Sequence, residues 1–185
     1  MNLREIHLTD AEAYIELLSQ LEKESPFVLL EAGERKTGIL EQMDEIREIE
    51  ASDNQIIFVV EDRDKLVAWC GAFGERYRRV RHTVLIGIGV LEGYRSKGWG
   101  TKLFEAIEEW AWKQDIRRLE LFVQTKNKAG IALYRKMGFQ IEGTKRESYQ
   151  INGEYVDEYL MAKLLLVHPI YHLGKWLFLG GSGTT

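Results

Sequence analysis

The feature that most constrains this chain is a glycine-rich turn, Arg-Ser-Lys-Gly-Trp-Gly at residues 95–100, between a predicted strand and a predicted helix. An apolar run over His82–Val90 precedes the turn, and Trp99–Gln114 has the apolar spacing of a helix. The first amides of a helix have no partner within it, and the helix dipole places partial positive charge at that end. The turn therefore predicts a phosphate-binding site, because its glycines open the backbone and its arginine and lysine add positive charge. Taken alone, the turn is equally consistent with a connection that only needs glycine.

Composition and spacing exclude several functional classes. The turn lacks the glycine spacing of a dinucleotide-binding fold and of a P-loop. A net charge of −4 leaves no basic excess for a nucleic-acid backbone. The N-terminus lacks the plan of a signal peptide, and no apolar run approaches the roughly 20 residues of a membrane span. We therefore expect a cytoplasmic protein that binds neither nucleic acid nor membrane.

Cysteine and histidine usage argues against a metal site or a covalent enzyme. Cys70 is the one cysteine, and its apolar surroundings predict a buried thiol rather than a nucleophile. The four histidines show no metal-ligand spacing, so no metal is expected.

The order of apolar patterns predicts an α/β (α+β) domain with a mixed, mostly antiparallel sheet of about six to seven strands flanked by helices. We expect this domain at residues 1–167 and a C-terminal tail of open role at residues 168–185. Strands are expected at Leu3–Leu8, Ile56–Val60, Leu66–Phe73, Val80–Val90, Arg117–Val123, Phe139–Glu142 and on both sides of an Asn152-Gly153 hairpin turn. Helices are expected before Pro26, around Ile39–Ile49, at Trp99–Gln114 and at Asn127–Lys136. The helix between the strands at 80–90 and 117–123 makes that pair parallel.

Two motifs together resemble the GNAT superfamily of N-acetyltransferases. Arg95-x-x-Gly98-x-Gly100 is similar to the superfamily's acetyl-coenzyme A signature. A second block follows in the expected order and is similar to its V-x-x-x-N-x-x-A-x-x-L-Y-x-x-x-G-F pattern: Val123, Asn127, Gly130 in place of the usual alanine, Leu133-Tyr134 and Gly138-Phe139. The order of strands and helices agrees with that fold from Leu3 to Leu165.

The resemblance implies a coenzyme site between two splayed parallel strands, here Val84–Val90 and Leu119–Val123. The pantetheine arm of acetyl-coenzyme A would lie between them, with Gly87 and Gly89 letting the backbone bulge toward the thioester. The diphosphate would lie on the amides of the glycine-rich turn. The implied coenzyme-binding residues are Ile88, Val90, Arg95, Ser96, Lys97, Gly98, Trp99, Gly100, Thr101 and Asn127.

The resemblance also implies direct transfer of acetyl to a primary amine within a ternary complex. Tyr134 is the expected proton donor to the leaving thiolate, or else a core aromatic residue. Asn127 is expected to bind the pantetheine, to cap its helix, or both. No carboxylate occurs in Val84–Val90, so the general base stays open. The candidates on the acceptor side are Glu31, Glu34, Glu154 and Asp157.

The sequence does not identify the acceptor amine. A small amine is favoured slightly by the acidic balance, and acetylation of a protein N-terminus or lysine is the alternative. A non-catalytic acetyl-coenzyme A-binding module is a further alternative of another class. The apolar segment Ile170–Leu179 leaves a homodimer open.

Overall fold

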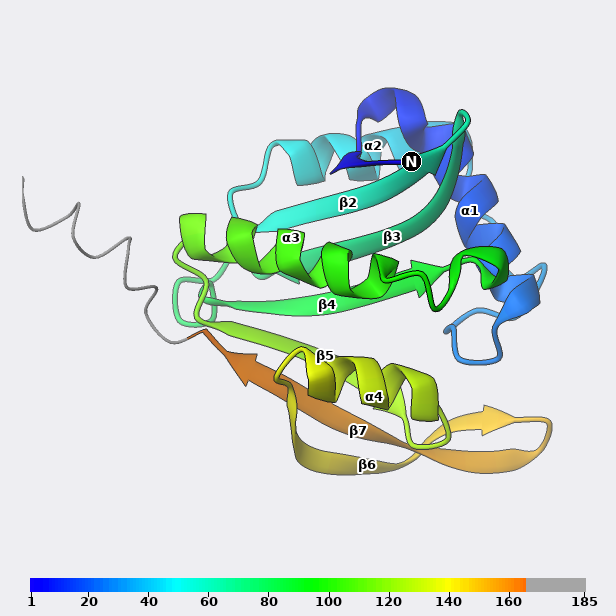
Figure 1. Cartoon of the computed structure of the whole chain (residues 1–185), viewed down its shortest axis with the longest axis vertical. Coiled ribbons are helices and arrows are strands. Elements are labelled where there is room, and N and C mark those ends of the chain that lie inside the picture. The colour runs from blue at the N-terminus through cyan, green and yellow to red at the C-terminus, as the bar shows by residue number, and fades with distance from the viewer. Residues whose placement is uncertain (166–185) are drawn as a thin grey trace, which may run out of the picture.

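A computed structural model describes residues 1–165, so the expected tail at 168–185 lies outside the described residues. The described chain forms a sheet of seven strands with helices on both faces (Figure 1). Its strands are β1 (Asn2–Glu5), β2 (Gln55–Asp62), β3 (Lys65–Gly74), β4 (Thr83–Val90), β5 (Arg118–Gln124), β6 (Gln140–Ile151) and β7 (Glu154–Leu164). Its helices are α1 (Ala11–Glu24), α2 (Ile39–Glu50), α3 (Trp99–Lys113) and α4 (Lys128–Lys136), with short 3-10 turns η1 (Leu8–Asp10) and η2 (Glu92–Tyr94).

The strand order is β1-β2-β3-β4-β5-β7-β6, and every neighbouring pair is antiparallel except β4 and β5. These two are parallel because α3 carries the chain back across the sheet between them. The predicted fold class and the predicted parallel pair are both confirmed.

Each face of the sheet is covered by its own pair of helices. On one face α3 and α4 bury a core that includes Leu103, Phe104 and Ile107 of α3. On the other face α1 and α2 pack on the part of the sheet near β2 and β3, with Ile46 fully buried. The early helices therefore cover the sheet, as expected. None of the helices in residues 1–165 is long and apolar enough to cross a lipid bilayer.

The last hairpin is longer than its sequence pattern predicts. The expected short strand at Phe139–Glu142 and the expected strand before Asn152 are parts of one strand, β6, of 12 residues. Irregularities near Gly143 and between Lys145 and Tyr149 absorb extra residues while β6 stays paired with β7. The intervening residues are polar and mostly exposed, so no apolar alternation marked the continuation.

The expected bulge at Gly87 and Gly89 is wrong. β4 pairs with β3 without a shift from Val84 to Val90. The glycines instead make room for the Trp69 side chain, which lies across β4. A Cβ atom at Gly87 would lie 2.8 Å from the Trp69 ring, and one at Gly89 would lie 2.7 Å from its Nε1 atom.

Candidate active site

The central feature of the site is the separation of β4 from β5. The two strands pair only at their beginnings, through Thr83–Arg118, Val84–Leu119 and Leu85–Glu120. Beyond these three pairs the strands diverge toward their C-terminal ends (Figure 1). A splayed parallel pair is what the family resemblance implied, and the divergence leaves backbone groups of both strands without a strand partner among residues 1–165.

Backbone alternation identifies which groups of β4 face this gap. The amide of Leu91 donates to the Val67 carbonyl at 3.0 Å, so Leu91, Gly89 and Gly87 direct their backbone groups toward β3. Ile88 and Val90 then direct their N–H and C=O groups toward the gap. An extended ligand arm in the gap can therefore hydrogen-bond to these groups as an added strand would, and the Val90 carbonyl among them also accepts a hydrogen bond from Arg95.

The glycine-rich turn connects the end of β4 to the N-terminus of α3. Gly98 has φ of +84° at the N-cap of α3, a left-handed conformation that favours glycine. The Lys102 amide donates to the Gly98 carbonyl at 3.1 Å, so the amides of Trp99 to Thr101 precede the first hydrogen bond within α3 and have no backbone partner in the described part of the chain. Gly100 has a different role, because its Cβ would lie 2.7 Å from Leu133 of α4.

Hydrogen bonds from three segments hold this turn in place. The Glu92 amide donates to the Glu24 carboxylate of α1 at 2.7 Å, and this bond lowers the pKa of Glu24. The Tyr94 hydroxyl donates to Asp62 at the end of β2 at 2.8 Å. Arg95 donates through Nε to the Val90 carbonyl at 2.9 Å. The turn is thus organised before any ligand binds.

Cationic side chains surround the first turn of α3. Lys97 donates to the Gly93 carbonyl at 2.7 Å, and Lys102 lies 4.6 Å from the centre of the Trp99 ring. Lys136 of α4 donates to the Thr101 hydroxyl at 3.1 Å. Unpaired amides, a helix N-terminus and these cations suit a diphosphate, so the residues present fit a coenzyme A molecule.

Tyr134 of α4 has a ring held by aromatic contacts and a hydroxyl without a hydrogen-bond partner among residues 1–165. Its ring packs edge-on against Phe104, with centroids 5.8 Å apart, and lies 6.2 Å from Phe139. Burial raises the pKa of Tyr134. Its hydroxyl forms no hydrogen bond with another described residue, so it can donate a proton to a ligand. Asn127 caps α4 by accepting from the Gly130 amide at 2.9 Å.

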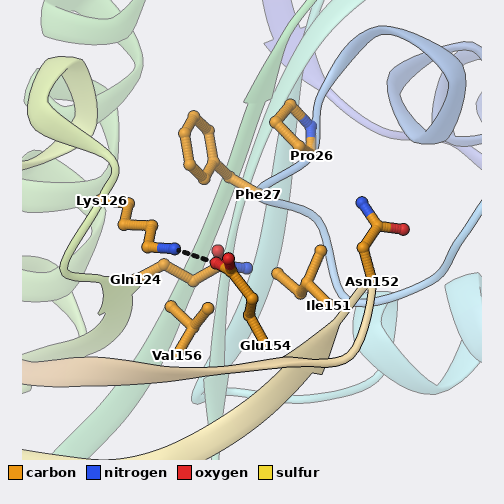
Figure 2. Close-up of a pocket in the computed structure, with 8 residues that line it drawn as sticks. All are labelled: Pro26, Phe27, Gln124, Lys126, Ile151, Asn152, Glu154 and Val156. Atoms are coloured by element: carbon orange, nitrogen blue, oxygen red, sulfur yellow. Dashed lines mark hydrogen bonds and ion pairs between the residues drawn. The ribbon is translucent and has the colours of Figure 1, made fainter.

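A pocket of about 420 Å³ lies between the α1–α2 loop, the end of β5 and the β6–β7 hairpin (Figure 2). Its apolar walls come from the loop and the hairpin and comprise Pro26, Phe27, Ile151 and Val156. Its charged and amide groups include Gln124, Lys126 and Glu154. The pocket adjoins the C-terminal end of β5, where the strand has separated from β4.

The structure brings one of the four predicted acceptor-side carboxylates to this pocket. Glu154 lines it and pairs with Lys126 at 3.0 Å. Glu31 and Glu34 are exposed, and the Glu34 carboxylate accepts from the Glu31 amide at 2.8 Å. Asp157 accepts from the Glu147 amide at 2.8 Å, and strand alternation directs it away from the face of Val156.

Sequence reasoning missed Gln124 and Lys126. Gln124 is only 4% exposed, and its Nε2 atom has no hydrogen-bond partner among the described residues. The available signal was a polar residue directly after the apolar run that ends at Val123, on the strand expected to splay.

Other candidate reactive groups are absent from residues 1–165 or inert. No group of three or more His, Cys, Asp or Glu side chains in this region is arranged to hold a metal ion. Cys70 is fully buried, and burial raises the pKa of its thiol. The expected burial of Cys70 is therefore confirmed.

Comparison with known proteins agrees with this geometry. Residues 15–139 match the model of the acetyltransferase (GNAT) family. The L-amino acid N-acetyltransferase of Escherichia coli (strain K12) is 37% identical over 92 residues, which are 49% of this chain and 56% of that protein. An N-alpha-acetyltransferase of Mycobacterium tuberculosis (strain ATCC 25618 / H37Rv) is 37% identical over 76 residues, which are 41% of this chain and 45% of that protein. The match thus spans about half the length of these curated relatives.

Solved structures share the architecture over most of the chain. An acetyltransferase of the GNAT family from Streptococcus pneumoniae has a TM-score of 0.85 and 31% identity, covering 89% of this chain and 99% of that one. A GNAT superfamily phosphinothricin acetyltransferase from Sinorhizobium meliloti, in complex with acetyl-coenzyme A, has a TM-score of 0.77. It is 19% identical, covers 89% of this chain and 88% of that one, and supports the fold alone.

Proposed function

Because the chain belongs to the GNAT acetyltransferase family, we propose that it transfers the acetyl group of acetyl-coenzyme A to a primary amine. The observation that carries this proposal is the parallel pair β4–β5, which stops after three residue pairs beside the glycine-rich turn at residues 95–100. A slot bounded by unpaired backbone suits the pantetheine arm, and the first turn of α3 suits the diphosphate.

Acetyl-coenzyme A would supply an activated acyl group as a thioester. Ile88 and Val90 would hold the arm through backbone groups. The turn from Arg95 to Thr101 would bind the diphosphate through amides and cations. In this role Asn127 acts through α4, because its side-chain oxygen accepts from the Gly130 amide and so fixes the first turn of that helix.

The chain also offers groups for the two proton movements of the reaction. An amine attacks only when it has lost its proton, and a leaving thiolate benefits from a donor. Tyr134 is our proposed donor, because burial keeps its phenol neutral beyond the ordinary pKa near 10. Among the four acceptor-side carboxylates, the location of Glu154 in the pocket favours it for receiving the amine proton through water.

A small amine is the proposed acceptor, and it would bind in the pocket beside the end of β5. The pocket's volume of about 420 Å³ suits a molecule of that size. One relative is named for L-amino acids, which supports this choice. The second candidate is a protein N-terminus, and the relative named as an N-alpha-acetyltransferase favours it over a lysine side chain.

The test combines a binding measurement with an assay of free thiol release. Calorimetry with coenzyme A and acetyl-coenzyme A should detect binding, and a panel of amines and N-terminal peptides should release thiol with matching acetylated product. Absence of binding would refute the coenzyme site. Binding without turnover on any acceptor would instead indicate a non-catalytic acetyl-coenzyme A-binding module.

A further inference from the structure

Gln124 is a buried polar side chain with an unmet hydrogen-bonding requirement. The residue is only 4% exposed, and its buried Nε2 atom has no hydrogen-bond partner among the described residues. A buried amide donor costs free energy unless it gains an acceptor. Since Gln124 also lines the pocket, a bound ligand is the natural source of that acceptor (Figure 2).

The position of Gln124 in β5 places its side-chain amide beside the proposed position of the thioester. The parallel register pairs Thr83 with Arg118, and its continuation places Gln124 level with Gly89 across the gap. Gly89 lies between Ile88 and Val90, whose backbone groups face the gap. A molecule that uses the Gln124 amide is therefore next to the proposed thioester position.

Lys126 supplies a second donor at the same wall of the pocket. Its ammonium pairs with Glu154 at 3.0 Å, but the two side chains are 61% and 74% exposed. An ion pair this exposed contributes little stability, so an incoming anion can take the place of Glu154. Figure 2 shows Lys126 and Gln124 extending from the end of β5 toward Glu154, with Phe27 across the pocket.

Apart from Asn152, the rest of the pocket wall is apolar. Pro26 and Phe27 come from the α1–α2 loop, and Ile151 and Val156 come from the hairpin. Two adjacent donors and an apolar wall match a molecule with a carboxylate and an apolar side chain. A diamine or polyamine offers neither feature.

We propose that the acceptor is a free α-amino acid with an apolar side chain, which deepens and rests on the proposed function. Its carboxylate binds the Gln124 amide and the Lys126 ammonium. Its side chain packs against Phe27 and Val156, and its amine is directed to the gap. A peptide N-terminus offers Gln124 a neutral carbonyl and has no use for the Lys126 charge.

The test compares each apolar amino acid with its carboxamide, which keeps the amine and side chain but removes the anion. Wild-type kcat/KM should favour the free acid by roughly tenfold or more, since bonds to charged groups are the stronger ones. Dipeptides with the same first residue distinguish a free amino acid from a peptide acceptor.

Three substitutions assign the preference to residues. Lys126→Met should raise KM for the acid by roughly tenfold and leave the carboxamide unchanged. Glu154→Gln should lower KM for the acid, because it removes the competitor for Lys126, and should lower kcat as well, because Glu154 is the proposed acceptor of the amine proton. Lys113→Met is the matched control, since Lys113 forms a similarly exposed pair with Glu109 at 2.7 Å on α3. Gln124→Met should raise KM for the acid and, to a smaller extent, for the carboxamide, whose carbonyl can also accept from the Gln124 amide; thermal unfolding is measured to verify the fold of this variant.

The outcomes separate this inference from the proposed function. Equal use of acid and carboxamide, or transfer only to peptides or polyamines, overturns the inference and leaves the acetyltransferase proposal in place. Coenzyme binding without transfer to any amine overturns the proposed function. An acid preference that survives both Lys126→Met and Gln124→Met also overturns the inference.

Discussion

At the scale of single residues, Tyr134 shows how packing and chemistry can be assigned to different atoms of one side chain. Its ring contacts Phe104 and Phe139 in the core under α3 and α4, while its hydroxyl has no partner among the described residues. The two interpretations of this tyrosine from sequence, core aromatic and proton donor, therefore do not compete.

Substitution Tyr134→Phe tests the chemical part alone. The ring and its contacts are retained, so we expect thermal stability and coenzyme affinity close to those of the wild type. Turnover should fall at least several-fold, because a positioned general acid contributes roughly 100-fold or more. Steady-state kinetics and calorimetry on the same preparation measure both quantities. Unchanged kcat would remove Tyr134 from the mechanism.

At the scale of elements, the connection from β4 to α3 depends on backbone conformation at Gly98. An alanine at φ of +84° carries a strain of about 1–2 kcal/mol, although its Cβ would meet no atom within 4 Å. We expect Gly98→Ala to relax the turn, to misdirect the first amides of α3 and to weaken coenzyme A binding by roughly tenfold.

Gly143→Ala is the control for this change. Gly143 lies in β6 outside the positive-φ positions, and its Cβ would also meet no atom within 4 Å. Calorimetry should show wild-type affinity for it. Equal affinity in the Gly98 variant would mean that the turn does not bind the diphosphate.

The packing of strand β4 leads to a second prediction at this scale, because the glycines of β4 make room for the Trp69 side chain. A Cβ at Gly89 would lie 2.5 Å from Leu21 and 2.7 Å from Trp69 Nε1. Gly89→Ala should therefore destabilise the fold by about 1–3 kcal/mol, which is a loss of several degrees in Tm. Adding Trp69→Leu should recover part of this loss, since the two changes share one contact. Additive losses in the double variant would contradict this account of the glycines.

At the scale of the whole molecule, local patterns predicted the elements better than they predicted the contacts between them. The parallel pair followed from α3 lying between β4 and β5, and the turn before α3 followed from its glycines and its place before a helical pattern. The role of Gly87 and Gly89 did not follow, because the space they leave is filled by Trp69 from a neighbouring strand. The unmet amide of Gln124 is likewise visible only once the pocket is assembled from the α1–α2 loop and the hairpin.

The splayed pair also divides the sheet into two parts, β1–β4 and β5–β7–β6, which are joined in the sheet by three residue pairs. A ligand arm in the gap would contact both parts at once. Acetyl-coenzyme A at about 100 times its Kd should stabilise the fold by about 2.7 kcal/mol, which raises Tm by roughly 5–10 °C.

Hydrogen exchange can locate this stabilisation. Amide protection should increase at Ile88 and Val90 on β4 and, on the opposite side of the gap, at Phe122 and Gln124 of β5, whose alternation also directs them toward the gap. The Gly98→Ala variant, compared at the same ligand concentration, should show a smaller increase at all four positions because less of it is bound. Protection confined to the α3 turn would mean that the coenzyme is held by its diphosphate alone, and the gap would lose its assigned role.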